Sequence, residues 1–251
     1  MPSPIRVVVP IDSQDPSAWA HALAYAEMIG AQAEPAARDY ILLTHTKQQL
    51  SQTSLGNHVG AAQAKTLLAN KDLGLPNGAR LRHATLQTLR GSARQAMIIA
   101  YFAEDKMMET IDGLTGVIGV VAVPHYAGEV DGWIARWNPV IHGQQSTAAV
   151  PLISDSVVAK ALESLSGSVN LSHSVMNPRD KQRANETLRI LRAKGHTLER
   201  EKIKSWAIRN GWQPSAADEL AKLAGKVQAL KATPSISGYH DPTGRYARWN
   251  E

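Results

Sequence analysis

The sequence predicts an α/β domain with a mainly parallel sheet of about four strands and helices on both faces, followed by a basic, all-helical domain. Two observations carry the prediction. Up to residue 145, β-branched runs alternate with stretches of helical periodicity, whereas three helical stretches follow one another after residue 176. The excess of Lys and Arg also lies entirely in the second part. We therefore place the α/β domain at 1–145, a linker with a short helix at 146–176, and the basic helical domain at 177–251.

The strands are distinguished from the helices by their periodicity. Strands are predicted at residues 5–11, 40–43, 80–89 and 116–123, and intervening helices at 16–30, 59–68 and 92–111. The run IRVVVPI is β-branched without helical spacing, and GVIGVVAV has the continuous apolar content of a strand covered on both faces. In residues 92–111, apolar residues recur every three or four positions, which predicts a long helix. Alternating strands and helices favour parallel pairing, so the domain resembles Rossmann-like modules in topology.

Composition and length exclude several classes of protein. The chain has 251 residues, of which 43% are hydrophobic and 20% charged, as in ordinary globular domains. The absence of cysteine excludes disulfides, thiolate zinc sites, iron–sulfur clusters and cysteine nucleophiles. The longest apolar run, residues 116–124, is too short to span a bilayer, and the N-terminus lacks a signal-type region. We expect a cytoplasmic protein that does not associate with membranes.

Polar residues follow the predicted strands. Ligands of open parallel sheets lie outside the carboxyl ends of the strands, which makes these residues the candidate ligand site. They are Asp12, Ser13, Thr44, His45, Arg90, Gly91, Ser92, Arg94 and His125. Free backbone N–H groups at a helix start near Ser92, flanked by arginines, would suit a small phosphate-bearing ligand such as a nucleotide. Polar residues follow strands in any α/β domain, however, and Ser92 equally suits a helix N-cap.

Standard catalytic and cofactor motifs are absent from the sequence. It contains neither G-x-G-x-x-G after the first strand nor G-x-x-x-x-G-K-[ST], and no G-x-S-x-G elbow. The nine histidines include no H-x-x-x-H or H-x-H pair. Glu104 and its acidic neighbours fall inside a predicted helix and are interpreted as a solvated face. We therefore expect no metal and no cofactor, and we assign no catalytic residue.

Two tryptophans follow the last predicted strand. Trp133 and Trp137 are four residues apart and share one face of a short predicted helix. They would either pack on the sheet or on a second copy of the chain, or stack on a base or ring. Packing is the interpretation we favour, and with it a homodimer.

The charge is unevenly distributed along the chain. Residues 1–150 carry 11 Lys and Arg against 12 Asp and Glu, whereas residues 151–251 carry 16 against 10. A basic segment joined to a near-neutral one is typical of a module that faces a large anion, and nucleic acid is the most abundant such anion in a cytoplasm. A solvated basic surface would have the same composition.

The helices of the basic segment resemble a helix-turn-helix unit over residues 178–231. A basic helix starts at Asn177-Pro178, a second spans residues 198–209, and a third follows a short turn containing Gly211. The residues expected to contact nucleic acid, DNA rather than RNA, are Arg179, Lys181, Arg183, Lys202, Lys204, Arg209, Gln213, Ser215, Lys222, Lys226, Arg245 and Arg248. Because the third helix begins with small and acidic residues, phosphate contacts are expected to dominate over base readout.

The last residues interleave aromatic and basic side chains. Arg245 and Arg248 lie among Tyr239, Tyr246 and Trp249, after a D-P-T-G turn signal. Two interpretations stay open: a small hairpin or wing that contacts nucleic acid, or a tail that packs its aromatic side chains back on its own domain.

Together these features favour a DNA-binding regulator with a ligand-sensing, dimerising α/β domain. One alternative is an enzyme that acts on nucleotides or nucleic acid through Asp12, His45 and Arg90. The other is a scaffold whose basic half binds an acidic protein.

Overall fold

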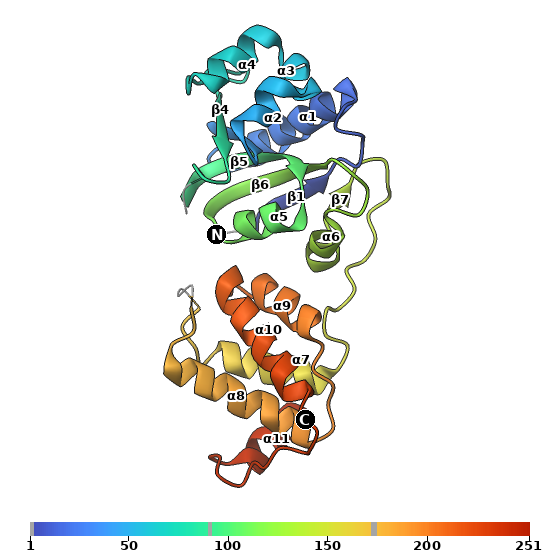
Figure 1. The fold of residues 1–251 in the computed structure, drawn as a ribbon, viewed down its shortest axis with the longest axis vertical. Coiled ribbons are helices and arrows are strands. Elements are labelled where there is room, and N and C mark those ends of the chain that lie inside the picture. Colours follow the sequence, from blue (N-terminus) through green and yellow to red (C-terminus); the bar gives the residue numbers. More distant parts are fainter. Residues whose placement is uncertain (1–2, 90–91, 172–174) are drawn as a thin grey trace. The chain divides into compact units, whose positions relative to one another are not determined.

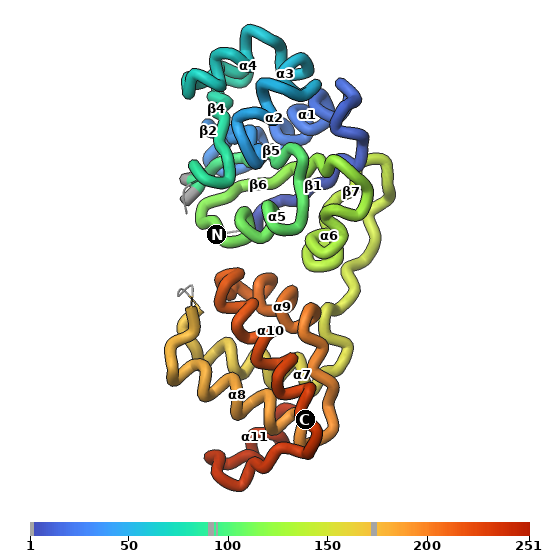
Figure 2. The backbone as a smooth tube through the Cα atoms, in the orientation of Figure 1, coloured from blue at the N-terminus to red at the C-terminus, as the bar shows by residue number. Residues whose placement is uncertain are grey.

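The computed structural model describes residues 3–89, 92–171 and 175–251, without the side chains of Ser92 and Arg94. The chain forms two compact units, Met1–Ala149 and Val150–Glu251. Figure 1 shows the first as a sheet with helices and the second as helices, and Figure 2 traces the backbone through both. Residues 90 and 91, which belong to the predicted ligand site, lie outside the described residues.

A seven-stranded sheet forms the centre of the first unit. Its order is β3-β4-β2-β5-β6-β1-β7, and every neighbouring pair is parallel except β3–β4. The strands are β1 (Ile5–Val8), β2 (Asp39–Thr44), β3 (Leu73–Gly74), β4 (Arg80–Thr85), β5 (Ser92–Ala103), β6 (Thr115–Pro124) and β7 (Val140–Ile141). The predicted α/β class with a mainly parallel sheet is confirmed, with seven strands in place of about four.

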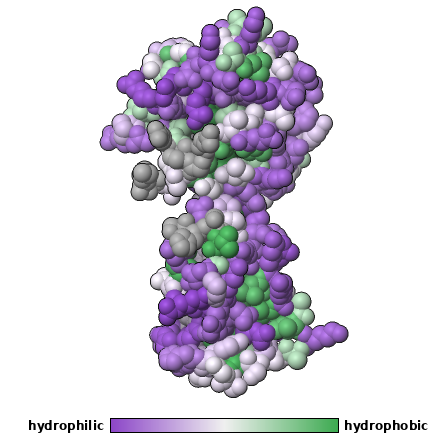
Figure 3. Space-filling view, turned by 60° about the vertical axis from the view of Figure 1, so that its left-hand side comes forward, coloured by the Kyte–Doolittle hydropathy of each residue, from purple (hydrophilic) through white to green (hydrophobic). Residues whose placement is uncertain are grey.

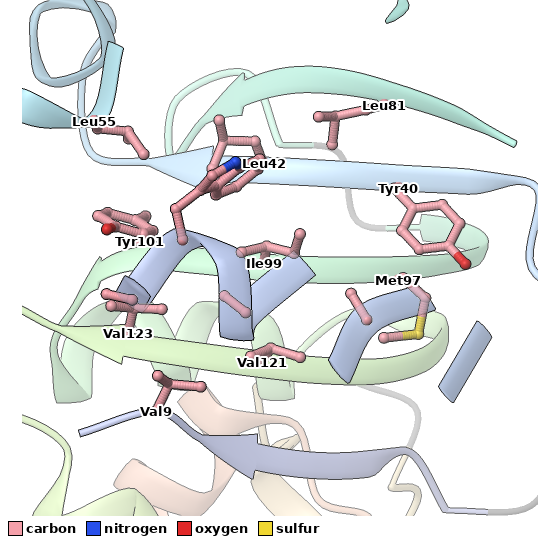
Figure 4. Close-up of a cluster of buried hydrophobic side chains, with 14 of the residues drawn as sticks. Val9, Tyr40, Leu42, Leu55, Leu81, Met97, Ile99, Tyr101, Val121 and Val123 are labelled. Atoms are coloured by element: carbon pink, nitrogen blue, oxygen red, sulfur yellow. The ribbon is translucent and has the colours of Figure 1, made fainter. Parts of the chain in front are cut away.

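Helices cover both faces of this sheet, as predicted. Four pack on one face, namely α1 (Pro16–Gln32), α2 (Lys47–Gln52), α3 (Ser54–Val59) and α4 (Ala61–Leu68), while α5 (Asp105–Asp112) and α6 (Asp131–Trp137) pack on the other. Alternate residues of β2 supply the two cores: Tyr40 and Leu42 belong to the first, Ile41 and Leu43 to the second. Figure 4 shows the first core, with Leu42, Ile99 and Val121 beside one another on neighbouring strands.

The predicted helix at 92–111 is wrong. Residues up to Ala103 form β5, which lies between β2 and β6, and the helix α5 starts only at Asp105. Residues 96–101 are fully buried, because the sheet is covered on both faces. Such a strand is apolar at nearly every position, so its sequence also contains the three- and four-residue spacing of a helix.

The second unit is all-helical in its described residues, which confirms the predicted class. Its helices are α7 (Ser156–Ser166), α8 (Pro178–Ala193), α9 (Arg200–Arg209), α10 (Pro214–Gln228) and α11 (Pro242–Asn250). Helix α7, which the sequence analysis assigned to a linker, packs against α8 and α11. In the view of Figure 3, hydrophilic residues make up most of the visible surface of both units.

The tail forms the helix α11, which packs against α7 and α8. The hairpin or wing is therefore wrong, and the alternative of a tail packed on its own domain is confirmed. The side chain of Asp241 accepts a hydrogen bond from the Gly244 N–H at 2.9 Å, and Pro242 occupies the first helical position. An Asp N-cap followed by Pro is a helix start. The same four residues therefore begin α11 where the sequence analysis read a turn, and Trp249 is buried.

Candidate functional site

A cavity of about 500 Å³ opens at the carboxyl ends of β2, β5 and β6. We call it the strand-end cavity. Its lining residues come from the end of β5, from the loops after four strands, and from α2, α3 and the residue between them: Gln14, His45, Gln49, Thr53, Ser54, Phe102, Glu104, His125 and Glu129. Its position agrees with the general rule for ligand sites of open parallel sheets, and its volume lies in the usual range for small-molecule pockets.

A buried hydrogen bond fixes one histidine of this cavity. Ser13 is fully buried, and its hydroxyl lies 2.7 Å from His125 Nδ1. The Tyr101 hydroxyl donates to the Ser13 carbonyl at 2.9 Å, which holds the loop after β1 against β5. Glu129 accepts hydrogen bonds from the backbone N–H groups of His125 and Tyr126, both at 2.9 Å. Ser13 thus holds the imidazole of His125, and Glu129 holds the backbone on which it lies.

The second histidine is held in one tautomer. His45 Nε2 lies 3.0 Å from the carbonyl oxygen of Phe102, which can only accept a hydrogen bond. The hydrogen of the neutral ring is therefore on Nε2, and Nδ1 keeps a free lone pair. The Gln49 side chain accepts from the His45 backbone N–H at 2.7 Å and closes the turn into α2.

Phe102 adopts a left-handed backbone conformation at the cavity, with φ 58°. The pairing of β5 with β6 shifts register between Tyr101 and Ala103, as at a β-bulge. The left-handed conformation costs a residue with a Cβ roughly 1–2 kcal/mol. The bulge places the Phe102 ring edge-on to His125, with the ring centres 5.6 Å apart.

Thr44 and His83 form a polar contact within the sheet. The Thr44 hydroxyl donates to the Thr46 carbonyl at 2.8 Å, so His83 Nε2, 2.9 Å away, is the donor to the Thr44 oxygen. Burial, with a smaller contribution from the charge of Lys47, lowers the pKa of His83 to about 4. Thr44 is fully buried and is absent from the cavity lining.

The structure brings together part of the predicted ligand site. His45 and His125 line the cavity, and Ser13, which is fully buried and absent from the lining, is hydrogen-bonded to His125. The Asp12 carboxylate accepts the backbone N–H of Gln14 in the loop after β1. Ser92 and Arg94 belong to the start of β5, so the helix start predicted at Ser92 is wrong. Arg94 precedes Phe102 by eight residues along β5, so it lies near the opposite end of this strand from the cavity.

Sequence reasoning missed the cavity residues contributed by α2, α3 and the start of α5. Glu104 was placed within a predicted helix, but it precedes α5 at the cavity. Among the described lining residues there is no Lys or Arg. Within the described residues, no group of three or more His, Asp or Glu is arranged to hold a metal ion. The lining thus favours a ligand other than the phosphate-bearing one expected from the sequence.

A second hollow, of about 570 Å³, lies in the helical unit and is lined by four arginines. We call it the arginine hollow. Its lining residues come from α7, α8, α11 and the adjoining loops: Ser164, Leu165, Ser168, Arg179, Arg183, Glu186, Thr187, His240, Arg245 and Arg248. All four of its arginines were predicted nucleic-acid contacts.

Contacts within the unit hold three of these arginines in place. Arg245 donates to Thr187 Oγ1 at 2.7 Å and to Glu186 at 3.2 Å, which joins α11 to α8. Arg183 donates to the Ser168 carbonyl, and Arg248 lies 3.4 Å from Asp241. Arg179 is exposed and has no ion-pair partner among the described residues. Glu186 is the single acidic residue among the described lining.

The predicted cations of α9 and α10 are mostly paired with acids. Asp218 lies 2.6 Å from Lys222 and 3.9 Å from Lys204, and the hydrogen bond from Lys222 lowers the pKa of this carboxyl. Lys202 pairs with Glu199 at 2.8 Å and, on α8, Lys181 with Glu219 at 3.3 Å. The remaining predicted contacts, Arg209, Gln213, Ser215 and Lys226, are exposed or half-buried at α9 and α10.

The tryptophans after β6 are packed in the protein. Trp133 is fully buried, and its indole N–H donates to Asp112 at 3.2 Å. The indole of Trp137 donates to the other oxygen of Asp112 at 3.0 Å, and Arg136 pairs with Asp112 at 2.7 Å. These contacts leave neither indole N–H for a ligand, so the packing interpretation is the one the structure favours.

Comparison with known proteins places a family match on the helical unit. Residues 154–250 match a family described as Domain of unknown function (DUF1889). The match spans less than half of the chain. No curated protein and no solved structure matches. No helix in the described ranges is both long and apolar enough to cross a membrane.

Proposed function

We propose that the chain is a DNA-binding protein whose helical unit holds the phosphate backbone through the arginine hollow. The convergence of Arg179, Arg183, Arg245 and Arg248 from two helices carries this proposal. Guanidinium groups bind phosphate oxygens in a bidentate manner, and most protein–DNA hydrogen bonds go to the backbone. Because contacts within the unit already hold Arg245 and Arg183 in place, binding would cost less side-chain conformational entropy.

Helices α9 and α10 are proposed to act as a helix-turn-helix element with a supporting role. The turn between them contains Gly211 at φ +87°, and Lys222 and Lys226 are exposed on α10. The acidic residues Asp218 and Glu219 lie near the start of this helix and engage lysines. The N-terminal end of α10 would enter the major groove, and two acidic residues at that end disfavour contacts with the bases. Binding is therefore proposed to be dominated by phosphate contacts, with duplex DNA preferred over RNA.

The α/β unit completes the proposed regulator. We propose that its Rossmann-like sheet forms the dimer contact and that it responds to a small ligand in the strand-end cavity. A ligand that changes DNA affinity must bind the free and DNA-bound states with different affinity, and the coupling is reciprocal.

Fluorescence anisotropy with a labelled 20-base-pair duplex tests the proposal. Arg179→Gln combined with Arg248→Gln removes the two more exposed arginines of the hollow, and Lys65→Gln with Lys71→Gln makes the same charge change on the α/β unit. The arginine variant is expected to bind about tenfold or more weakly, since each hydrogen bond to a charged group contributes roughly 1.5–3 kcal/mol. The lysine variant is expected to bind like the original chain.

Competition separates the proposal from the scaffold alternative. Unlabelled duplex should displace the labelled duplex more effectively than single-stranded RNA or polyglutamate at equal charge. Equal displacement by polyglutamate would show that the hollow reads charge alone and would contradict DNA binding as its function.

A further inference from the structure

We propose that the strand-end cavity binds a small molecule carrying a protonated amine. The cavity lies wholly within the α/β unit, so this inference does not depend on DNA binding by the helical unit. The same ligand chemistry is favoured by the charge of the lining, by its hydrogen-bond acceptors and by the ring of Phe102.

The first feature of the strand-end cavity is the charge of its lining. Glu104 occupies the position before α5, but its side chain makes no capping hydrogen bond and has no ion-pair partner among the described residues. Glu129 uses one carboxylate oxygen, Oε2, to accept from the loop after β6. No Lys or Arg side chain neutralises these groups in the described lining. The described lining therefore carries two carboxylates and no Lys or Arg, which favours a cation and repels phosphate.

The second feature is the set of hydrogen-bond acceptors in the lining. The tautomer of His45 leaves Nδ1 as an acceptor, because Nε2 donates to the Phe102 carbonyl. Glu104 and Glu129 add carboxylate oxygens to the same lining. An ammonium group has three N–H donors and no acceptor, which suits carboxylate oxygens together with the His45 lone pair.

Phe102 gives the cavity an apolar side. The strained bulge at the end of β5 positions this residue, and its ring is the one aromatic side chain in the described lining apart from the two imidazoles. An aromatic face attracts cations and also covers the uncharged part of a ligand. A lining that combines hydrogen-bond acceptors with an apolar ring thus favours a small organic amine over an inorganic cation. This agrees with the absence of a metal-holding cluster among the described residues.

Isothermal titration of the full chain with matched ligand pairs tests the charge preference. The amines are tyramine, putrescine and glucosamine, and the anions of similar frame are 4-hydroxyphenylacetate, succinate and glucose 6-phosphate. At least one amine is expected to bind saturably, with a dissociation constant of about 1 mM or tighter, while its matched anion does not bind. Absence of binding by all three amines up to about 10 mM, or equal binding of the anions, would overturn the proposal.

Substitution and NMR locate the binding. Glu104→Gln removes a carboxylate that makes no capping hydrogen bond and no ion pair among the described residues, so the fold should be retained. Amine binding should weaken about tenfold or more, the effect of one lost charge-assisted contact. Glu34→Gln, at an exposed glutamate between α1 and β2, is the control and should leave binding unchanged. The imidazole signals of His45 and His125 should shift on titration. Unchanged affinity in Glu104→Gln, or shifts confined to other histidines, would show that the amine binds elsewhere and would refute the site.

Discussion

The buried pair of Arg136 and Asp112 is predicted to be the most sensitive polar contact of the α/β unit. Their side chains are 6% and 2% exposed, and the guanidinium and carboxylate are 2.7 Å apart. Burial raises the pKa of Asp112, and the charge of Arg136 opposes that rise. The two indole N–H groups of Trp133 and Trp137 complete the shell around the carboxylate.

Replacing Arg136 by Met fills its volume but removes the ion-pair partner of the carboxylate and leaves it the smaller electrostatic contribution of Arg6. Removing one partner of a buried pair typically costs 3–5 kcal/mol, roughly the range expected here, and the two indole donors place the expected loss near the lower end, about 3 kcal/mol. Adding Asp112→Leu removes the uncompensated charge, so the double variant should recover much of this loss. Arg38→Met changes an exposed arginine and should cost less than about 0.5 kcal/mol.

Urea unfolding of the full chain measures these differences, and hydrogen exchange in peptides from β5 and β6 reports the α/β unit separately. Protection in these strands should fall for Arg136→Met and return in the double variant. A loss below about 1 kcal/mol for the single variant would refute the assignment of this pair as a coupled buried contact. A double variant as unstable as the single one would refute it equally.

Three further outcomes follow from the structure. His83, with its pKa lowered to about 4, should stay neutral in NMR titrations well below pH 6.5. The contribution of neutral His83 to stability is fully present above its unfolded-state pKa of about 6.5 and is lost as the pH falls towards 4. An NMR titration midpoint of His83 near 6.5 would contradict its burial. Burial alone would raise the pKa of Asp155, but the hydrogen bonds from His196 and from the backbone N–H of Val158 outweigh it and lower that pKa. Stability from Asp155 is therefore present above about pH 4 and lost below it, and Asp155→Asn should flatten this acid dependence in thermal unfolding. An added Cβ at Gly119 would lie 2.8 Å from Ile29 Cγ2 and 2.9 Å from Met97 Cε. Gly119→Ala should consequently cost about 1–3 kcal/mol in urea unfolding, whereas Gly74→Ala, with open space around it, should be tolerated.

The sequence predicted those elements whose pattern is local. The run around Val7 and the run around Val121 are apolar and β-branched, and both are strands. Asn177 and Pro178 mark the start of α8 through capping chemistry that depends on neighbouring residues alone. The central strand β5 escaped prediction because burial on both faces removes the alternation that identifies a strand.

The candidate sites depended on tertiary structure to a greater extent. His45 and His125 could be placed together because parallel strands share one carboxyl edge, which is a property of the fold class. Ser54 and Gln49 could not, because they reach the cavity through the packing of α2 and α3. The arginine hollow likewise joins α8 to α11, and no spacing in the sequence relates helices so far apart in the chain.

The salt dependence of duplex binding tests the central claim most directly. If the four arginines of the hollow each neutralise one phosphate, the slope of log K against log salt should be about −3.6, and affinity should fall about 150-fold between 50 and 200 mM salt. The variant with Arg179→Gln and Arg248→Gln should show a slope of about −1.8. A slope near zero for the original chain, or the same slope in both proteins, would contradict phosphate binding by this hollow.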